Sequence, residues 1–554
     1  MDVETLAAAI KLGKGQKGDQ GDPGFSPSAQ VEQTATGARI TVTDEKGTTT
    51  ADLALDDNLY PRFGVSGVGQ SESKLTRLWT SKEFSDPIVG TDTITASSPF
   101  DAYKPFNRKK CVGNWVKSAD GTKAVFNVQA YDGDADYAED GSMGDYVAIE
   151  IEPFYYFEEG DMLGVSEHQF PGWEIHPICV DYDGNIREKT YAPVYQLALK
   201  DGKAVSLPGL YLEGDSYMNL WAAGQTYENA DVKDFVMLTP TAYEHYNYLL
   251  FTIEYATQNC QSFMQGAASM RFQSSGSDKI VATLTNKVVI SGNLTSDYVV
   301  GQSVTFTDSA WSNSSYYDKH LITALARCDA DGTENASGAY TLITYGGDDA
   351  SSTVTLNTSY VLSMPWMTGA TYGYAGLGAV KGHTGSPVSN TSGKYPMRYR
   401  HCENLWGNVF SILHDLADAR VDEGNETYHL DWYYNADPRK VTKPYNFALS
   451  DLVESKGWVK LGVQTPSEQY KNGYIKELGR DDAYPFVRVP ITISGGSTTY
   501  YCDYAFLAPS YVVRSVRRRG DLYTGSDAGL ACFNAGRAPS SGSWRYGGEL
   551  FFAQ

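Results

Sequence analysis

The chain has 554 residues and a formal net charge of −22, with 13% aromatic residues, 54 glycines and 40 tyrosines. This length favours about two to four domains, and the composition suits short strands, turns and polar binding surfaces. The negative charge argues against nucleic acid as a partner, because affinity for a phosphate backbone requires a basic surface. The N-terminal sequence lacks the basic start of a signal peptide, and no run of about 18 apolar residues occurs. We therefore expect synthesis in a cytoplasm and no membrane insertion.

Two short patterns open the chain. Residues 1–12 predict a short helix that needs a partner to be stable in water. Residues 13–27 contain glycine at every third position from Gly15 to Gly24, which is the sequence requirement of a collagen triple helix. A flexible glycine-rich linker is the alternative for this segment. A collagen-like stalk predicts three chains, and hence an elongated homotrimer.

Residues 28–70 predict a small β module. Within it, Ala38–Thr43 and the threonine-rich run that ends at Leu53 flank a turn at Gly47, which predicts a β hairpin. The Gly-X-Y stretch and the segment after it, residues 13–54, resemble the N-terminal part of tail and baseplate proteins of phages that infect Gram-positive gut bacteria. The resemblance implies that residues 1–12 attach the chain to the virion.

Residues 90–279 alternate short strands with polar turns, and we expect them to form the first part of the main body. Tyr146–Phe157 has the alternation of a half-buried pair of strands. Thr241 and Glu244, behind Pro240, have the spacing of a capping box at the start of a helix. This helix is expected to pack on a sheet.

Residues 280–362 differ from both neighbouring regions because they carry strand and turn patterns without a helical period. Glycine- and serine-rich stretches flank them, as is common where a domain is inserted at a surface loop. We therefore predict an inserted small β module, followed by the second part of the body over residues 363–554.

The segment Tyr399–Phe410 is the first specific motif. It resembles the R-G-x-E-N-x-W-G-N element of formylglycine-generating-enzyme-like domains and of C-type-lectin-like domains in phage structural proteins. Glycine allows a close approach of two segments, tryptophan fills a core, and the acidic and amide side chains can satisfy backbone groups of loops. We expect a structural role for Glu403, Asn404, Trp406, Gly407 and Asn408.

The end of the chain, residues 518–547, resembles the C-terminal segment of the same family. In many members this segment is rewritten by a diversity-generating retroelement. The resemblance implies scaffold positions at Gly525, Ala528, Gly529, Leu530, Pro539 and Gly547. It implies an outward-facing, receptor-binding surface made of Asp521, Tyr523, Thr524, Phe533, Arg537, Ser543, Trp544 and Arg545.

Aromatic residues and arginines mixed with small polar residues are typical of binding surfaces. A sheet edge without a binding role is the alternative for this C-terminal segment. The chain departs from the family pattern at Arg519 and Leu522, which replace glycine and tryptophan, and at Glu549, which replaces a basic residue.

Arg514, Arg517, Arg518 and Arg519 form a basic cluster in an acidic chain. Such a cluster can attract an anionic ligand, for example a teichoic acid or an acidic polysaccharide. Pairing with nearby carboxylates is the favoured alternative.

The sequence gives little support for catalysis, for a cofactor or for a metal site. Cys502 and Cys532 do not reproduce the closely spaced catalytic pair of the formylglycine-generating relatives, and no motif selects two carboxylates for glycoside hydrolysis. Asp132–Asp136 opens like a calcium loop, but Tyr137 and Met143 stand where an EF-hand needs glycine and glutamate. The seven cysteines lack CxxC spacing, which predicts buried free thiols.

These patterns predict an α+β, β-rich chain: a C-type-lectin-like domain with an inserted small β module, a collagen-like stalk and a β hairpin. The resemblance implies a phage tail fibre protein, located in the virion tail, that binds a host-surface protein or polysaccharide and other phage tail proteins. A structural tail or baseplate protein without receptor contact is the alternative. Exposure of Tyr523, Phe533, Trp544 and Arg545 distinguishes the two functions.

Overall fold

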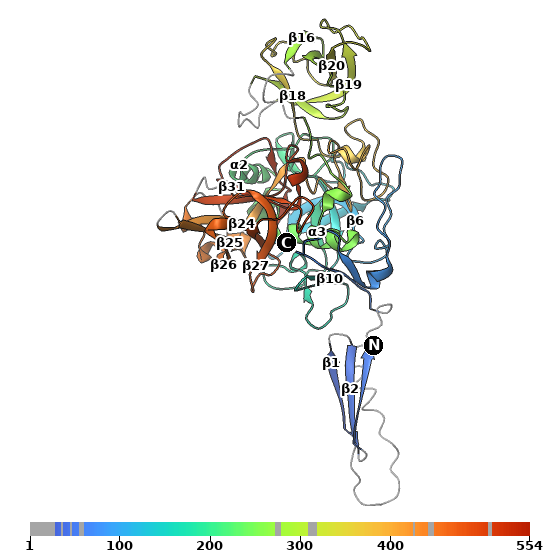
Figure 1. Ribbon diagram of the computed structural model, residues 1–554, viewed down its shortest axis with the longest axis vertical. Coiled ribbons are helices and arrows are strands. Elements are labelled where there is room, and N and C mark those ends of the chain that lie inside the picture. The colour runs from blue at the N-terminus through green and yellow to red at the C-terminus, as the bar shows by residue number, and fades with distance from the viewer. Residues whose placement is uncertain are drawn as a thin grey trace, which may run out of the picture.

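The computed structural model describes residues 28–34, 37–44, 47–54, 60–271, 279–308, 318–424, 427–440, 448–507 and 512–554. These residues form a β-rich fold with a small N-terminal sheet, a central body and an inserted β module at the opposite end of the long axis (Figure 1). The predicted helix over residues 1–12 and the collagen-like stalk over residues 13–27 lie outside the described residues. No helix in the described ranges is long and apolar enough to cross a membrane.

The N-terminal sheet has the order β1-β2-β3, with strands Ser28–Thr34, Gly37–Asp44 and Gly47–Ala54. Strands β2 and β3 pair antiparallel with Asp44 opposite Gly47, as the predicted hairpin requires. Strand β1, which no sequence pattern indicated, pairs with the other edge of β2. The predicted end of this module at residue 70 is wrong, because β4 (Arg62–Ser66) pairs with β10 (Met162–Ser166) in the body.

The first half of the body contains two sheets. One has the order β11-β9-β10-β4-β5, and its remaining strands are Glu174–Ile175, Tyr155–Glu159 and Thr76–Trp79. The other has the order β12-β8-β6-β7, with strands Thr190–Pro193, Tyr146–Ile151, Lys109–Lys117 and Ala124–Tyr131. Two short pairs lie outside these sheets: β13 (Ala198–Lys200) with β14 (Lys203–Val205), and, in the second half of the body, β22 (Arg398–Tyr399) with β23 (Cys402–Glu403).

Strand β8 is buried along its whole length, so the prediction of a half-buried strand is wrong here. At the start of the strand, the Tyr146 hydroxyl donates a hydrogen bond to the carbonyl of Leu550, near the C-terminal end. Toward its other end, the Glu150 carboxylate accepts hydrogen bonds from Tyr131 (2.6 Å) and Lys189 (2.9 Å). Polar groups of β8 are therefore bound by segments from several parts of the chain.

The second half of the body forms a large sheet in the order β26-β25-β24-β30-β31-β29-β27-β28, with β32 beside β24. It curls into a nearly closed barrel, since Thr465 at the end of β26 donates a hydrogen bond to the carbonyl of Pro490 in β28. The strands, in that order, are Trp458–Thr465, Thr427–Asn435, Phe410–Gly424, Val513–Arg519, Gly529–Arg537, Tyr504–Phe506, Gly473–Arg480, Arg488–Ile493 and Tyr546–Gly547. The last strand, β33 (Phe551–Phe552), pairs with β15 (Val236–Met237).

Helix α3 (Thr241–Tyr255) is the predicted helix, and it is buried on nearly every side between the sheets, whereas α2 (Tyr217–Gly224) is shorter. The predicted capping box is wrong. Asp415 of β24 accepts hydrogen bonds from the backbone N–H of Thr241 (2.9 Å) and from its hydroxyl (2.6 Å). Glu244 pairs instead with Arg519, at 2.6 Å. Short 3-10 helices join other elements, among them η2 (Pro177–Cys179), η6 (Pro438–Lys440) and η10 (Gly525–Asp527).

Replacing Asp415 with alanine is expected to lower the free energy of unfolding by about 1–2 kcal/mol, the usual cost of losing a helix cap. Urea unfolding followed by circular dichroism measures this difference. The matched control is Asp422→Ala on the same strand, whose side chain is 69% exposed and is expected to change stability by less than about 0.5 kcal/mol. Equal unfolding midpoints for the two variants would contradict a capping role for Asp415.

The inserted module forms a sheet in the order β16-β17-β20-β19-β18-β21, with strands Ile280–Leu284, Lys287–Ser291, Tyr340–Tyr345, His320–Cys328, Ser303–Thr307 and Tyr360–Ser363. It has a hydrophobic core of its own, which includes Val288, Ile290, Val304, Ile322 and Ile343. The two ends of the module meet, since the backbone N–H of Ile280 donates to the carbonyl of Ser359 at 2.9 Å. The module therefore leaves and re-enters the body at one place.

Candidate functional site

Six of the eight residues predicted to bind a receptor lie together, and we call them the Asp521 cluster: Asp521, Tyr523, Thr524, Ser543, Trp544 and Arg545. The Asp521 carboxylate accepts hydrogen bonds from the backbone of Tyr523 (2.9 Å) and from Nε of Arg545 (2.5 Å). The rings of Tyr523 and Trp544 meet edge to face at 5.7 Å. Burial works against the charge of Arg545, but the carboxylate of Asp521 outweighs it and raises the pKa of Arg545.

The predicted outward position of three residues is wrong. Asp521 and Phe533 are 0% exposed and Trp544 is 3% exposed. Phe533 points from β31 into the barrel core, where it meets Trp432 edge to face at 5.3 Å. Trp544 belongs to a hydrophobic cluster with Leu522, and Asp521 is enclosed by the hydrogen bonds of its own loop. None of the three side chains can therefore meet a partner from solution.

The remaining predicted residues reach the surface to different degrees. Arg537 is exposed, and Tyr523, Thr524, Ser543 and Arg545 are partly exposed. Arg537 lies at the end of β31, away from the Asp521 cluster. The accessible part of the predicted surface is thus smaller and more polar than the sequence indicated.

The Asp521 cluster lies at the base of the inserted module. The Tyr523 hydroxyl donates a hydrogen bond to the carbonyl of Ser363, the last residue of β21. On the other connection of the module, the backbone N–H of Met270 donates to the carbonyl of Leu522 at 2.8 Å. Trp366 packs in the same hydrophobic cluster as Trp544. The C-terminal segment therefore holds both connections of the inserted module.

In the motif at residues 399–410, the acidic and amide side chains bind backbone groups of segments near the base of the inserted module. The Glu403 carboxylate accepts hydrogen bonds from the backbone N–H groups of Gly369 and Thr371, both at 2.8 Å. Asn404 exchanges hydrogen bonds with the backbone of Met397. Burial raises the pKa of Glu403 to about 7, although the hydrogen bonds from Thr371 and Gly369 act in the opposite direction.

The other members of the motif fill space and bind the segment that leaves the module. Trp406 is fully buried. Gly407 has φ +71°, and a Cβ atom there would lie 2.8 Å from the carbonyl oxygen of Ala267, so only glycine fits without a shift. Oδ1 of Asn408 accepts a hydrogen bond from the backbone of Trp366 at 2.7 Å.

No family model matches the chain, and no curated protein matches it. The contacts of its own residues are therefore the basis for assigning a function.

The arginines of β30 are buried, so the hypothesis that they attract a ligand from solution is wrong. Arg514 pairs with Asp418, and Arg518 donates to the carbonyls of Cys532 (3.1 Å) and Leu530 (2.9 Å). The favoured alternative, pairing with carboxylates, applies to Arg514 and Arg519. Burial raises the pKa of Asp418 to about 7, against the effect of its ion pair with Arg514.

Arg519 has φ +79°, a left-handed conformation that favours glycine, and glycine is what the resembled pattern has there. Its guanidinium pairs with both Glu244 and Glu549. Two of the departures from the family pattern, Arg519 and Glu549, therefore contact each other. The sequence contained both departures, but their spacing gave no indication that they are partners.

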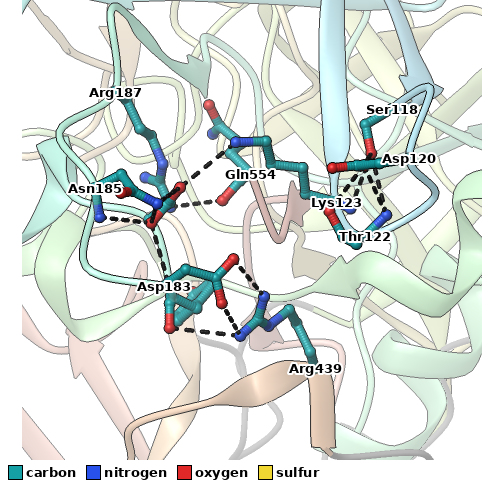
Figure 2. A network of polar contacts seen from close by, with 11 residues as sticks. Ser118, Asp120, Thr122, Lys123, Asp183, Asn185, Arg187, Arg439 and Gln554 are labelled. Carbon is teal, nitrogen blue, oxygen red and sulfur yellow. Dashed lines mark hydrogen bonds and ion pairs between the residues drawn. The ribbon is translucent and has the colours of Figure 1, made fainter.

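A wide groove of about 700 Å³ lies between β7 and the loop that follows η2 (Figure 2). Three of its charged side chains have partners: Lys123 lies 3.4 Å from Asp181, and Arg187 donates to the main-chain carbonyl oxygen of Gln554 at 3.0 Å. Arg439, which follows the barrel strand β25, reaches the same loop (Figure 2). The hydrogen bond from Arg187 fixes Gln554 at the edge of this groove.

Within the part of the chain that the structure describes, no group of three or more His, Cys, Asp or Glu side chains is placed to hold a metal ion. All seven cysteines are buried and free. Burial raises the pKa of Cys502 to about 12 and that of Cys532 well above its ordinary value. Both thiols are therefore protonated at neutral pH and are weak nucleophiles.

Proposed function

We propose that the chain is a phage tail fibre protein of the receptor-binding type, with a C-type-lectin-like body in an elongated homotrimer. It attaches the virion to a protein or polysaccharide on the host surface, and its N-terminal end contacts other tail proteins. The observation that carries this proposal is the position of the Asp521 cluster at the base of the inserted module, on the side of the body away from the N-terminal sheet (Figure 1).

The binding surface in this proposal consists of Arg537 with the accessible parts of Tyr523, Thr524, Ser543 and Arg545. Arginine and tyrosine are frequent at the centres of binding surfaces, and small hydroxyl residues add adaptable hydrogen bonds. Three copies per fibre give avidity even when each contact is weak. A structural tail or baseplate role is the second candidate, and the burial of Asp521, Phe533 and Trp544 within the chain favours it.

Binding of the fluorescently labelled chain to a panel of bacterial cells tests the proposal by flow cytometry. The wild-type chain is expected to bind at least one strain. The double variant Arg537→Glu, Ser543→Glu is expected to bind that strain at least about tenfold more weakly, the effect of losing a single strong contact of about 1.4 kcal/mol.

The matched control is Lys203→Glu, which reverses an exposed charge on β14, far in sequence from the C-terminal segment. It is expected to bind like the wild type. Equal binding by all three proteins would remove the C-terminal surface as the contact. If the wild type binds none of the strains, the structural tail or baseplate role becomes the better assignment.

A further inference from the structure

A small cavity in the body is lined by residues that take no part in the proposed receptor binding. Its volume is about 70 Å³, and its polar lining consists of Asp101, Asn107, Arg108, His383, Arg400 and His401. Since one water molecule needs roughly 10–15 Å³, the space suits several waters or one tetrahedral oxyanion. Asn107 is exposed and Asp101 is 40% exposed, so the cavity opens to solvent.

Arg108 is the most informative residue of this lining. Its side chain is buried, with 5% of the residue exposed, yet no carboxylate of the described residues pairs with it. It donates to Oδ1 of Asn247 at 3.0 Å and to Sγ of Cys402 at 3.7 Å, and it lies over the rings of Tyr246 and Tyr399. Its Nε atom is buried without a hydrogen-bond partner. A buried charge in this state is costly unless an anion compensates it.

His401 supplies a second buried polar group without a hydrogen-bond partner. Its Nδ1 atom is buried without a hydrogen-bond partner. The residue has φ +75°, in the left-handed region where glycine is favoured and other side chains are strained. Burial lowers the pKa of His401, with Arg398 and Lys110 adding to the effect. A neutral imidazole can carry its proton on Nδ1 and donate it to an acceptor in the cavity.

The carboxylates near the cavity already have cationic partners. Glu254 binds Arg400 through two hydrogen bonds of 2.7 Å. Asp101 lies 3.0 Å from Arg400 and 3.1 Å from His383. Both acidic side chains therefore contact Arg400, and neither forms an ion pair with Arg108.

We propose that this cavity binds a small oxyanion, a phosphate or carboxylate group, which accepts hydrogen bonds from Arg108 and His401. The planar guanidinium provides several donors for such a group. The anion is either a free ion or the acidic group of a host polymer. The inference does not depend on receptor binding by the C-terminal segment, because the cavity shares no residue with that surface.

Isothermal titration of the full chain with inorganic phosphate, at constant ionic strength, tests this site. The wild type is expected to bind one phosphate per chain. His401→Gly is expected to fold, because glycine suits this backbone conformation, and to bind at least about tenfold more weakly, since a hydrogen bond to a charged group is lost. Arg108→Gln is expected to abolish measurable binding. The control His168→Gln changes a surface histidine outside the cavity and is expected to bind like the wild type.

Two results would overturn the proposal: no binding of phosphate by the folded wild type, or equal binding by the wild type, His401→Gly and Arg108→Gln. Parallel titrations with a glycerol phosphate oligomer and with glucuronate identify the source of the anion. Tighter binding of the oligomer or of glucuronate than of phosphate assigns the site to a host polymer, and tighter or equal binding of phosphate assigns it to the free ion. Cell binding by the Arg537→Glu, Ser543→Glu variant is a separate measurement, so failure of either proposal can be recognised.

Discussion

Replacing Arg519 with methionine is expected to lower the free energy of unfolding by about 3–5 kcal/mol, the usual cost of removing one partner from a buried ion pair. Arg519 is fully buried between Glu244 of α3 and Glu549 near the C-terminus. Burial raises the pKa of Glu244, and the guanidinium of Arg519 opposes this effect. Without the arginine, two carboxylates remain buried with no cation between them.

Urea unfolding monitored by tryptophan fluorescence measures this loss. The control Arg537→Met removes an exposed arginine from the neighbouring strand β31 and is expected to change stability by less than about 0.5 kcal/mol. Adding Glu244→Gln and Glu549→Gln to Arg519→Met is expected to recover part of the loss, because the uncompensated charges disappear. If Arg519→Met is as stable as Arg537→Met, the ion pairs of Arg519 with Glu244 and Glu549 contribute nothing to the free energy of unfolding.

Acidification below about pH 6.5, the ordinary pKa of histidine, is expected to destabilise the body through two buried histidines. The backbone N–H of Ile178 donates to Nδ1 of His176 at 3.1 Å, which leaves the proton of this ring on Nε2. Nε2 of His176 therefore donates to Nδ1 of His245 at 2.9 Å. Nε2 of His245 in turn donates to Glu158 at 2.8 Å. The chain of hydrogen bonds requires both rings to be neutral.

The direction of the effect follows from the pKa shifts. Burial lowers the pKa of His176 well below its ordinary value, and it also lowers that of His245, although Glu158 acts in the opposite direction. Arg480 and Arg488 bind the same Glu158 carboxylate and oppose a further positive charge. The stabilisation is complete above about pH 6.5 and is lost as the pH falls, by up to about 1.4 kcal/mol per pH unit for each histidine.

Thermal unfolding between pH 8 and pH 5 measures the effect, with the double variant His176→Gln, His245→Gln as the comparison. Asp415, Asp418 and Glu403 have pKa values raised to about 7 by burial and contribute a dependence of the opposite sign. These groups are present in both proteins, so the difference between the two pH profiles isolates the histidines. Parallel profiles would rule out the histidines as the cause of acid sensitivity.

The local parts of the fold were predictable from the sequence. Alternating patterns and turn residues indicated the hairpin of β2 and β3, and the start signals at Pro240 and Thr241 located α3. The cap of that helix was not predictable, because Asp415 is 174 residues away in the chain. The barrel was not predicted either, since its order depends on pairings such as β24 with β30, which no local pattern reveals.

The candidate site was also predictable only in part, because the burial of its residues depends on contacts between distant segments. The sequence selected residues that meet in the Asp521 cluster, but burial of Trp544 depends on packing beside Trp366 at the base of the inserted module. Phe533 is buried because the register of β31 turns its side chain inward, toward Trp432. The cavity beside Arg108 joins segments almost 300 residues apart. No residue of its lining was predicted to form a site, because no local pattern connects segments so far apart.

The junction of the inserted module has a consequence for changes in the length of this chain. Because Ile280 and Ser359 are hydrogen-bonded neighbours at that junction, the module can be replaced by a unit of another length without shifting the register of any strand in the body. Recombination at this point preserves the barrel and the cluster that holds both connections. A change of the whole unit thus leaves in place the C-terminal residues that hold its two connections.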